Sequence, residues 1–109
     1  MVLAKMVEQE DEDVRLDLYL KLSRLVPRRT GAKELCEAGE VRINGQPAKA
    51  GRDVHPGDRL AVLLPSREIT VEVLALPAGR SVSKAAAREL FRVLGERRFD
   101  LFGNELPPR

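Results

Sequence analysis

The sequence has few side chains of the kinds that perform catalysis or bind metals. Its 109 residues include one cysteine, one histidine and no tryptophan. A metal site or a cysteine–histidine pair needs several such groups in one place, so neither is expected. A glycine-rich phosphate loop is also missing. We therefore expect a protein that is not an enzyme and that uses no metal or cofactor.

The sequence also lacks a second cysteine, a long apolar run and a secretory signal, and these absences indicate the cellular compartment. The single cysteine, Cys36, has no partner for an internal disulfide, which indicates a reducing compartment. The longest apolar run, residues 60–64, ends at Pro65 and is far too short to span a bilayer. The N-terminus lacks the pattern of a secretory signal. We expect a cytoplasmic monomer without membrane contact, with a core of Leu, Val, Ile and Ala.

Charge is distributed unevenly along the chain, although its net value is only +2. Residues 1–13 hold one lysine and five acidic residues, and they are expected to form a flexible acidic leader. Residues 14–49 hold eight basic and four acidic residues. A basic segment of this kind favours a polyanionic partner.

The hydrophobic pattern predicts an α+β fold. Apolar residues at helical spacing indicate two short helices, over residues 14–25 and 28–38, with Pro27 between them. The pair Asn44-Gly45 then predicts a tight hairpin, because both residues tolerate a positive φ. The two helices are expected to pack on a small, mostly antiparallel sheet.

The second half of the chain supplies the rest of the sheet and one more helix. Strands are expected over residues 59–64 and 69–76, because turn residues precede each run, and β-branched residues alternate in the second run at Ile69, Val71 and Val73. Ser81 or Ser83 can cap a C-terminal helix that continues to Leu94 and docks on the sheet. The remaining residues are expected to be loose.

Charged side chains fall on the outer faces of the two predicted helices. Asp17, Lys21 and Arg24 lie together on the first helix, and Asp17 is expected to pair with Lys21. Gly31 is costly inside a helix and suggests a close approach of another backbone. An outward stripe at four-residue spacing follows the second helix, formed by Arg29, Lys33 and Glu37. Cys36 is expected on the inner face, and His55 in a turn with a structural or exposed role.

A set of short motifs occurs in one order along residues 14–64. They are Arg15-Leu16-Asp17, Arg24-Leu25, Arg28-Arg29-Thr30, Ala32-Lys33, Gly39 with Val41, Asn44-Gly45, Lys49 and the run from Val54 to Asp58. Together they resemble the S4-like RNA-binding domain, also called the alpha-L motif. The chain is most similar to the small stand-alone, ribosome-associated members, the quality-control factors of the RqcP type and a related heat-shock ribosome-binding protein.

The resemblance implies a role on the ribosome. Members of this type bind rRNA and tRNA on large ribosomal subunits that still carry peptidyl-tRNA, in the rescue of stalled ribosomes. A factor that adds a C-terminal tail to the nascent chain is a further implied partner. The domains expected are a flexible leader (residues 1–13), the S4-like domain (14–76), the docking C-terminal helix (77–95) and a flexible tail (96–109).

The resemblance also predicts which residues bind RNA. Phosphate contacts supply most of the affinity for RNA, and arginine offers a planar fork suited to phosphate. Aromatic side chains are scarce, so recognition of RNA shape and phosphates is expected rather than base stacking. The candidate residues are Arg15, Lys21, Arg24, Arg28, Arg29, Thr30, Lys33 and Lys49.

Two other functions fit a domain of this size. The same RNA-binding domain can be an accessory to an RNA-modifying enzyme or to a tRNA synthetase, although this chain has no room for a catalytic domain. The chain can also be a protein-interaction module that uses its acidic leader and apolar surfaces. Retention of nucleic acid by the purified protein distinguishes RNA binding from the second of these alternatives.

Overall fold

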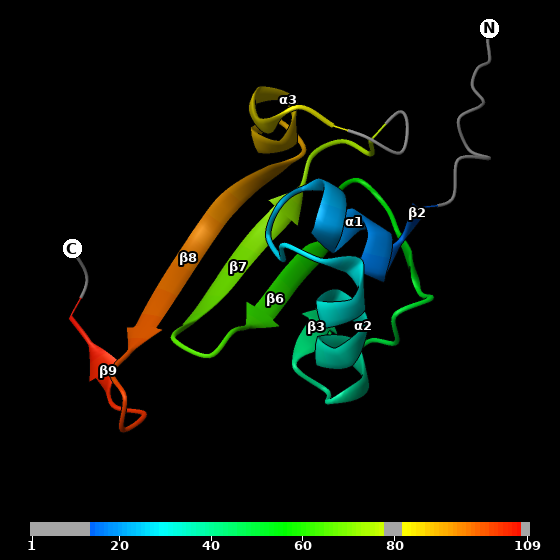
Figure 1. Ribbon diagram of the computed structural model, residues 1–109. Coiled ribbons are helices and arrows are strands. Elements are labelled where there is room, and N and C mark those ends of the chain that lie inside the picture. The colour runs from blue at the N-terminus through cyan, green and yellow to red at the C-terminus, as the bar shows by residue number, and fades with distance from the viewer. Residues whose placement is uncertain (1–13, 78–81, 108–109) are drawn as a thin grey trace, which may run out of the picture.

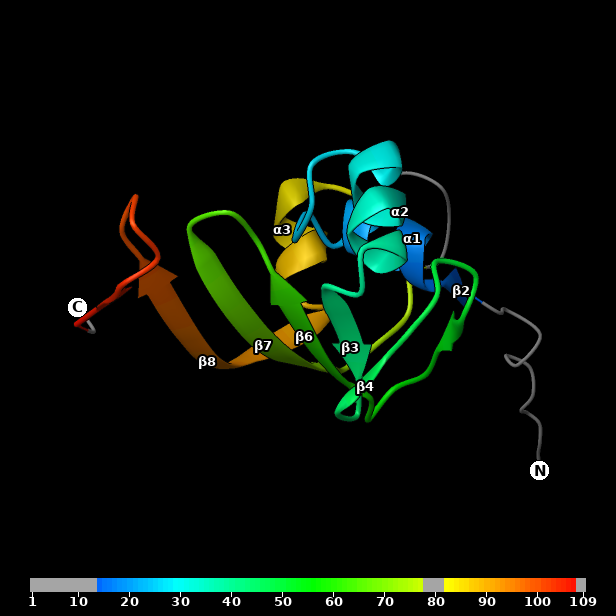
Figure 2. The same ribbon diagram turned by 90° about the horizontal axis from the view of Figure 1, so that it is seen from below.

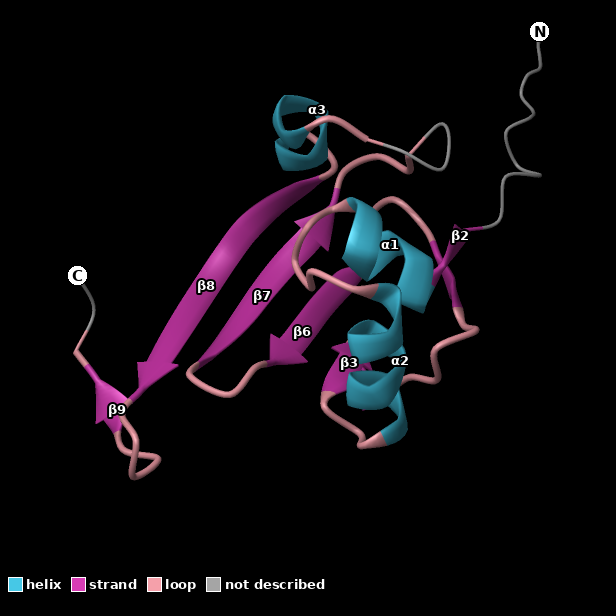
Figure 3. Cartoon of the chain, viewed as in Figure 1, coloured by secondary structure: helices cyan, strands magenta, loops and turns pink. Residues whose placement is uncertain are grey.

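The structure is a computed structural model that describes residues 14–77 and 82–107. It has the predicted α+β fold, with three helices on one face of an antiparallel sheet (Figures 1, 2 and 3). The elements are β2 (Val14–Arg15), α1 (Leu16–Leu22), α2 (Arg29–Glu37), β3 (Val41–Ile43), β4 (Gln46–Pro47), β5 (Asp53–Val54), β6 (Arg59–Leu63), β7 (Arg67–Val73), α3 (Lys84–Arg88), β8 (Phe91–Phe99) and β9 (Glu105–Leu106). The predicted leader, residues 1–13, lies outside the described residues.

The main sheet has six strands in the order β4-β3-β6-β7-β8-β9, and every neighbouring pair is antiparallel. Alternate residues of its central strands turn toward the helices, because side chains along a strand point to opposite faces. The buried set consists of Val41, Ile43, Leu60, Val62, Ile69, Val71 and Val73. These side chains form one apolar core with Leu16, Tyr19 and Leu20 of α1.

The hairpin between β3 and β4 is formed as predicted. Asn44 and Gly45 have φ values of 52° and 88°, so both central residues occupy the left-handed region. The Asn44 side chain also accepts a hydrogen bond from Arg59 N at 3.0 Å and donates one to Asp58 Oδ1 at 3.2 Å. The hairpin turn is thereby joined to the turn that precedes β6.

The first predicted helix begins later than expected. Val14 and Arg15 form β2, which pairs antiparallel with Val54 and Asp53 of β5, so α1 starts only at Leu16. The second helix, α2, agrees with its prediction to within one residue at each end. In the part of the chain that the structure describes, no helix is long and apolar enough to cross a membrane.

The C-terminal helix is present but much shorter than predicted. It ends at Arg88, and the expected helical residues Val93 and Leu94 belong to strand β8. Residues 90–94 carry apolar side chains at helical spacing, yet β8 pairs with β7 from Phe91 to Arg98 and satisfies its backbone there. The expectation of a loose tail from residue 96 is also wrong for the described residues, because β8 extends to Phe99 and β9 follows.

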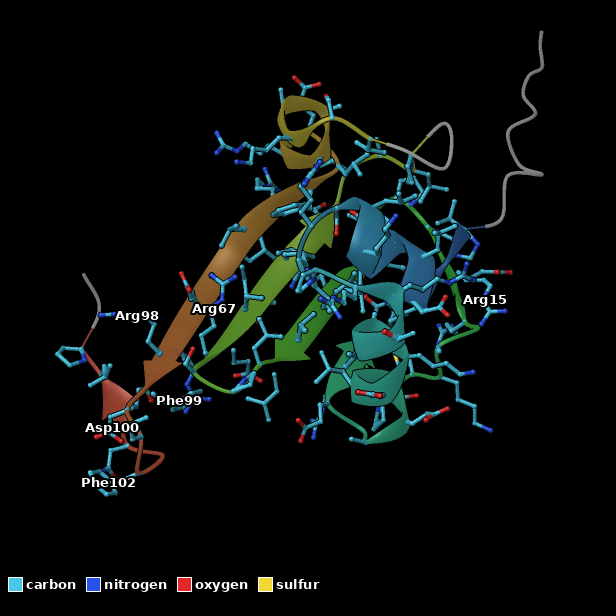
Figure 4. All side chains as sticks on the ribbon, in the orientation of Figure 1. Arg15, Arg67, Arg98, Phe99, Asp100 and Phe102 are labelled. Atoms are coloured by element: carbon cyan, nitrogen blue, oxygen red, sulfur yellow. The ribbon has the colours of Figure 1, made fainter. Side chains whose placement is uncertain are left out.

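The far ends of the last three strands extend away from α1 and α2 (Figure 1), and we call residues 64–73 and 91–107 the β-arm. Its far end is the turn between β8 and β9, which lies away from α1 and α2 (Figures 1 and 4). Tyr19 connects α1 to its near end. The buried Tyr19 hydroxyl donates a 2.7 Å hydrogen bond to the carbonyl of Leu90, just before β8.

The close backbone approach expected at Gly31 is not present. A Cβ atom added there meets only the side chain of Val26, at an ordinary contact distance of 3.7 Å. The glycine therefore has no packing reason in the fold of the described residues.

Candidate nucleic-acid interface

The centre of the predicted RNA-binding face is a buried carboxylate. Asp17 is only 2% exposed. It accepts hydrogen bonds from Arg15 Nε and Nη2, both at 3.2 Å, and from Arg29 Nε at 3.4 Å. Both arginine side chains remain about half exposed. One carboxylate thus holds two guanidinium groups from different elements side by side at the surface.

This arrangement corrects the expectation for Asp17. The sequence placed Asp17 outward and paired it with Lys21, but the structure buries it and pairs it with arginines of β2 and α2. Burial opposes ionisation of Asp17. The hydrogen bonds from Arg15 and from Leu18 N, together with the charges of Arg29 and Arg15, outweigh burial and hold the pKa of Asp17 below its ordinary value of 3.8. Asp17 is therefore ionised at neutral pH.

A second group of cations surrounds a hollow beside α1. The hollow measures about 520 Å³ and is lined by Lys21, Leu22, Arg24, Pro27, Val82 and Lys84. Arg24 has a φ of 65°, which is uncommon for a residue with a Cβ atom. Its Nη2 donates a 3.3 Å hydrogen bond to the carbonyl of Val82. Lys84 of α3 was not among the predicted residues, because only the folded chain brings it to Lys21 and Arg24.

The start of α2 presents backbone donors beside further cations. Arg28 is the N-cap residue, has an extended backbone, and no side chain caps the first turn. The amides of that turn therefore remain available as donors near the exposed Arg28 and Thr30. A helix start of this kind suits an anion, because its amides and the helix dipole both favour negative charge.

The stripe along α2 ends near Lys49. Arg29, Lys33 and Glu37 are exposed at successive turns, as predicted. Lys49 and Glu37 line a second hollow of about 500 Å³, together with Cys36, Gly39, Pro47, Ala48 and Ala50. The nine residues of α2 span about 12 Å, so the stripe connects the Asp17 cluster with Lys49 over the length of one helix.

We call the surface formed by these groups the cationic face and define it by the eight predicted residues and Lys84. Arg29, Thr30 and Lys33 lie on α2, and Arg28 is its N-cap residue. Lys49 lines a hollow with Glu37 near the C-terminal end of this helix. Arg15 joins them through Asp17, whereas Lys21 and Arg24 gather around the separate hollow beside α1. Their role in RNA binding remains a prediction.

Cys36 and His55, the other side chains considered for a chemical role, have surroundings that indicate a structural role. Cys36 is 6% exposed within the core, and burial, followed by the charges of Asp17 and Glu37, raises its pKa to about 11. Its thiol is therefore protonated and packed. His55 is exposed in the turn before β6, where its backbone N donates to Asp58 Oδ2 at 2.9 Å. Among residues 14–77 and 82–107, no cluster of three metal-ligating side chains occurs.

Comparison with known proteins identifies the family. The S4 domain model matches residues 14–60. The RQC P-site tRNA stabilizing factor of Bacillus subtilis (strain 168) is 43% identical over 83 residues, which cover 76% of this chain and 94% of that protein. Heat shock protein 15 of Escherichia coli (strain K12) is 34% identical over 82 residues, 75% of this chain and 62% of its own.

The fold comparison gives the same relationship. The trimeric structure of Vibrio cholerae heat shock protein 15 superposes with a TM-score of 0.70 at 30% sequence identity, over 75% of this chain and 82% of that chain. Three observations indicate the same family. They are the order of motifs along residues 14–64, the arrangement of α1 and α2 on the sheet, and the sequence identity over nearly the whole Bacillus protein. The chain belongs to the family of the RQC P-site tRNA stabilizing factors, which is built on the S4 domain.

Proposed function

We propose that this protein is a non-enzymatic RNA-binding factor that holds rRNA and tRNA on the large ribosomal subunit. It acts in the cytoplasm on stalled ribosomes that still carry peptidyl-tRNA. Its binding supports a partner that adds a C-terminal tail to the nascent chain. The name of the Bacillus subtilis relative, a factor that stabilizes P-site tRNA, supports this proposal.

The observation that carries the proposal is the pair of arginines on Asp17. A carboxylate that is 2% exposed fixes Arg15 and Arg29 next to each other while both remain about half exposed. Fixed guanidinium groups lose less side-chain freedom on binding than free ones, so they suit a phosphate backbone of defined shape. A catalytic role needs no such arrangement.

The cationic face binds RNA by neutralising phosphates. Lys21, Arg24 and Lys84 surround one hollow, and the start of α2 offers uncapped amides beside Arg28. Each phosphate contact releases a counterion, so the affinity falls steeply as salt rises. The protein performs no bond chemistry and acts by holding tRNA and rRNA together.

The test compares two arginines whose side chains are similarly exposed. Arg29 pairs with Asp17 at 3.4 Å on the cationic face, and Arg67 pairs with Glu96 at 2.9 Å on the β-arm. Their side chains are 48% and 40% exposed. Sedimentation with purified large subunits that carry peptidyl-tRNA is measured at rising salt. We expect Arg29→Glu to lose at least about tenfold in affinity and to flatten the salt dependence, because it removes a phosphate contact.

The control variant Arg67→Glu carries the same change of charge. We expect it to bind large subunits within about twofold of the unmodified protein, because its arginine lies outside the cationic face. Equal losses for both variants mean that only net charge matters and contradict the proposal. Absence of binding by the unmodified protein at low salt also contradicts it.

A further inference from the structure

The turn between β8 and β9 exposes two large apolar side chains at the far end of the β-arm. Leu101 is 99% exposed and Phe102 is 88% exposed. Soluble proteins seldom place neighbouring large apolar residues in full contact with water unless the site binds something. Figure 4 shows Phe102 at the far end of the β-arm, whereas Arg15 lies on the other side of the molecule. We call this pair of residues the apolar tip.

The backbone of the apolar tip is held in one conformation. Asp100 Oδ1 accepts hydrogen bonds from Phe102 N and Asn104 N, both at 2.9 Å. Asp100 N donates to Asn104 O at 2.8 Å, and Gly103 N donates to Asp100 O at 3.1 Å. Gly103 has a φ of 83°, which closes the turn. The side chains of Leu101 and Phe102 take no part in these bonds, so the backbone of the turn is held while both side chains remain free to make contacts.

Charge on the β-arm argues against phosphate as the ligand. Arg67 pairs with Glu96, Arg92 with Glu72, and Arg97 with both Glu68 and Glu105. Arg98 donates to the carbonyl of Pro107 at 3.2 Å. The β-arm holds five carboxylates against four arginines. On the cationic face, one carboxylate serves both Arg15 and Arg29, and the side chains of Arg28 and Lys33 lie exposed. An apolar tip on an arm with paired charges matches an apolar pocket on a protein better than a phosphate backbone.

The size of the apolar tip limits what it can do alone. An aromatic side chain buries about 150–250 Å². Stable interfaces bury about 800 Å² on each partner, so two side chains are too few to hold a dimer or an independent complex. They are enough for a second anchor on a particle that the protein already binds elsewhere. Linked sites gain from a high effective concentration, so a weak contact adds measurably to a strong one.

We propose that the apolar tip, Leu101 and Phe102, docks into an apolar pocket on a protein component of the particle whose RNA the cationic face binds. This inference rests on the proposed function, because the RNA contact brings the tip to the protein. The pocket receives Leu101 and Phe102 together, and the Asp100 turn presents both without reorganisation of its backbone. The cationic face and the tip thus bind different classes of molecule.

The experiment separates the two contacts by offering two binding partners. Binding is measured for the full chain to large ribosomal subunits and to protein-free rRNA extracted from the same subunits. The variants are the double change Leu101→Ser with Phe102→Ser, and the single changes Leu101→Ala and Phe102→Trp. The matched control is Leu74→Ser, which removes another exposed leucine, 46% exposed, away from the tip.

We expect the double tip variant to lose about tenfold or more in affinity for large subunits, as removal of an apolar anchor commonly does. The loss is expected at every salt concentration, because an apolar contact releases no counterions. Affinity for protein-free rRNA is expected to stay unchanged. Leu101→Ala is expected to weaken subunit binding alone, and Leu74→Ser to leave it unchanged.

Other results overturn the inference. If the double variant binds large subunits as well as the unmodified protein does, the tip is no anchor, and the proposed function stands without it. A different result would show that Phe102 stacks on a base instead. In that case, the double variant loses the same affinity for protein-free rRNA as for subunits, whereas Leu101→Ala and Phe102→Trp both bind as the unmodified protein does. If the double change alters the oligomeric state of the free protein, the tip contacts a second copy.

Loss of binding by the tip variants is not expected to result from unfolding. Leu101 and Phe102 lie almost entirely in solvent, and Asp100 and Gly103 hold the turn. The tip variants are therefore expected to unfold at the same urea concentration as the unmodified protein. A failure of the unmodified protein to bind both subunits and rRNA counts against the proposed function and is distinct from a failure of the tip alone.

Discussion

The cationic face and the β-arm both contain several arginines, but they use them differently. On the cationic face, one buried carboxylate serves two arginines, and the neighbouring lysines are exposed. On the β-arm, carboxylates on neighbouring strands pair with Arg67, Arg92 and Arg97. Arginine content alone therefore does not distinguish the two regions. The ratio of cations to nearby carboxylates, and the burial of those carboxylates, distinguishes the two regions.

The largest expected effect on stability comes from Asp17. Asp17→Asn removes the charge that holds Arg15 and Arg29, and we expect it to lower the free energy of unfolding by about 2 kcal/mol at pH 7. The matched change on the β-arm, Glu96→Gln, is expected to cost less than about 0.5 kcal/mol because its ion pair is exposed. Urea unfolding measures the free energy of unfolding of both variants. Equal losses of stability would mean that the buried carboxylate Asp17 stabilises the fold no more than the exposed Glu96 does.

The same variant tests the pH dependence. The pKa of Asp17 is lower in the folded protein than its ordinary value of 3.8, so its stabilising effect is fully present above that value. The effect is lost as the pH falls below 3.8 and through the lower pKa of the folded state. We expect Asp17→Asn to lose less stability than the unmodified protein between about pH 5 and about pH 2.5. Parallel curves for the two proteins contradict this.

Tyr19 tests the connection between the two regions. Tyr19→Phe removes the 2.7 Å hydrogen bond to the Leu90 carbonyl, and we expect a loss of about 1 kcal/mol in the free energy of unfolding. The carbonyl keeps bonds from Leu74 N at 2.8 Å and Ala75 N at 3.2 Å, so a larger loss is not expected. The RNA binding that we propose for the cationic face is expected to be unchanged in this variant.

Gly31 gives a smaller effect of opposite sign. An alanine Cβ at this position meets only Val26 Cγ1 at 3.7 Å, and glycine inside a helix is unfavourable. We therefore expect Gly31→Ala to raise the free energy of unfolding by about 0.5–1 kcal/mol. A thermal unfolding experiment measures the change, and a loss of stability means that the backbone there needs glycine for a reason that its neighbours do not reveal.

The smallest expected effect is on the β-arm. Arg67→Gln breaks the exposed pair with Glu96, and we expect a change of less than about 0.5 kcal/mol in the free energy of unfolding. The effect is expected to shrink further as salt is raised. A loss comparable to that of Asp17→Asn shows that the paired charges of the arm stabilise the fold as strongly as the buried carboxylate does.

Local sequence patterns were sufficient for much of the fold. Asn44-Gly45 predicted the hairpin because its turn needs two positive φ values, and both are observed. The spacing of Arg29, Lys33 and Glu37 predicted an exposed stripe because one helical turn relates them. In both cases, the residues that decide the structure lie within a few positions of each other.

Long-range contacts could not be predicted in this way. Asp17 appeared to be on an outer helix face, and its pairing with Arg29, twelve positions later, exists only in the folded chain. Leu90, Val93 and Leu94 fit a helix locally, but pairing with β7 places residues 91–99 in a strand. Lys84 lines the hollow around Lys21 and Arg24 only because folding brings α3 close to α1. Each of these features depends on residues distant in sequence.

The irregular step in the ladder between β7 and β8 has a consequence for solubility. Thr70 faces Gly95 and Val71 faces Val93, so Leu94 is an extra residue that interrupts the regular alternation. Only Arg98 and Phe99 of β8 pair with β9, and the outer side of residues 91–97 has no partner strand within the described chain. A straight edge of this length invites strands of other molecules to add to it. Because a β-bulge bends its strand locally, we expect the extra leucine to make this edge a poor template for strands of other molecules.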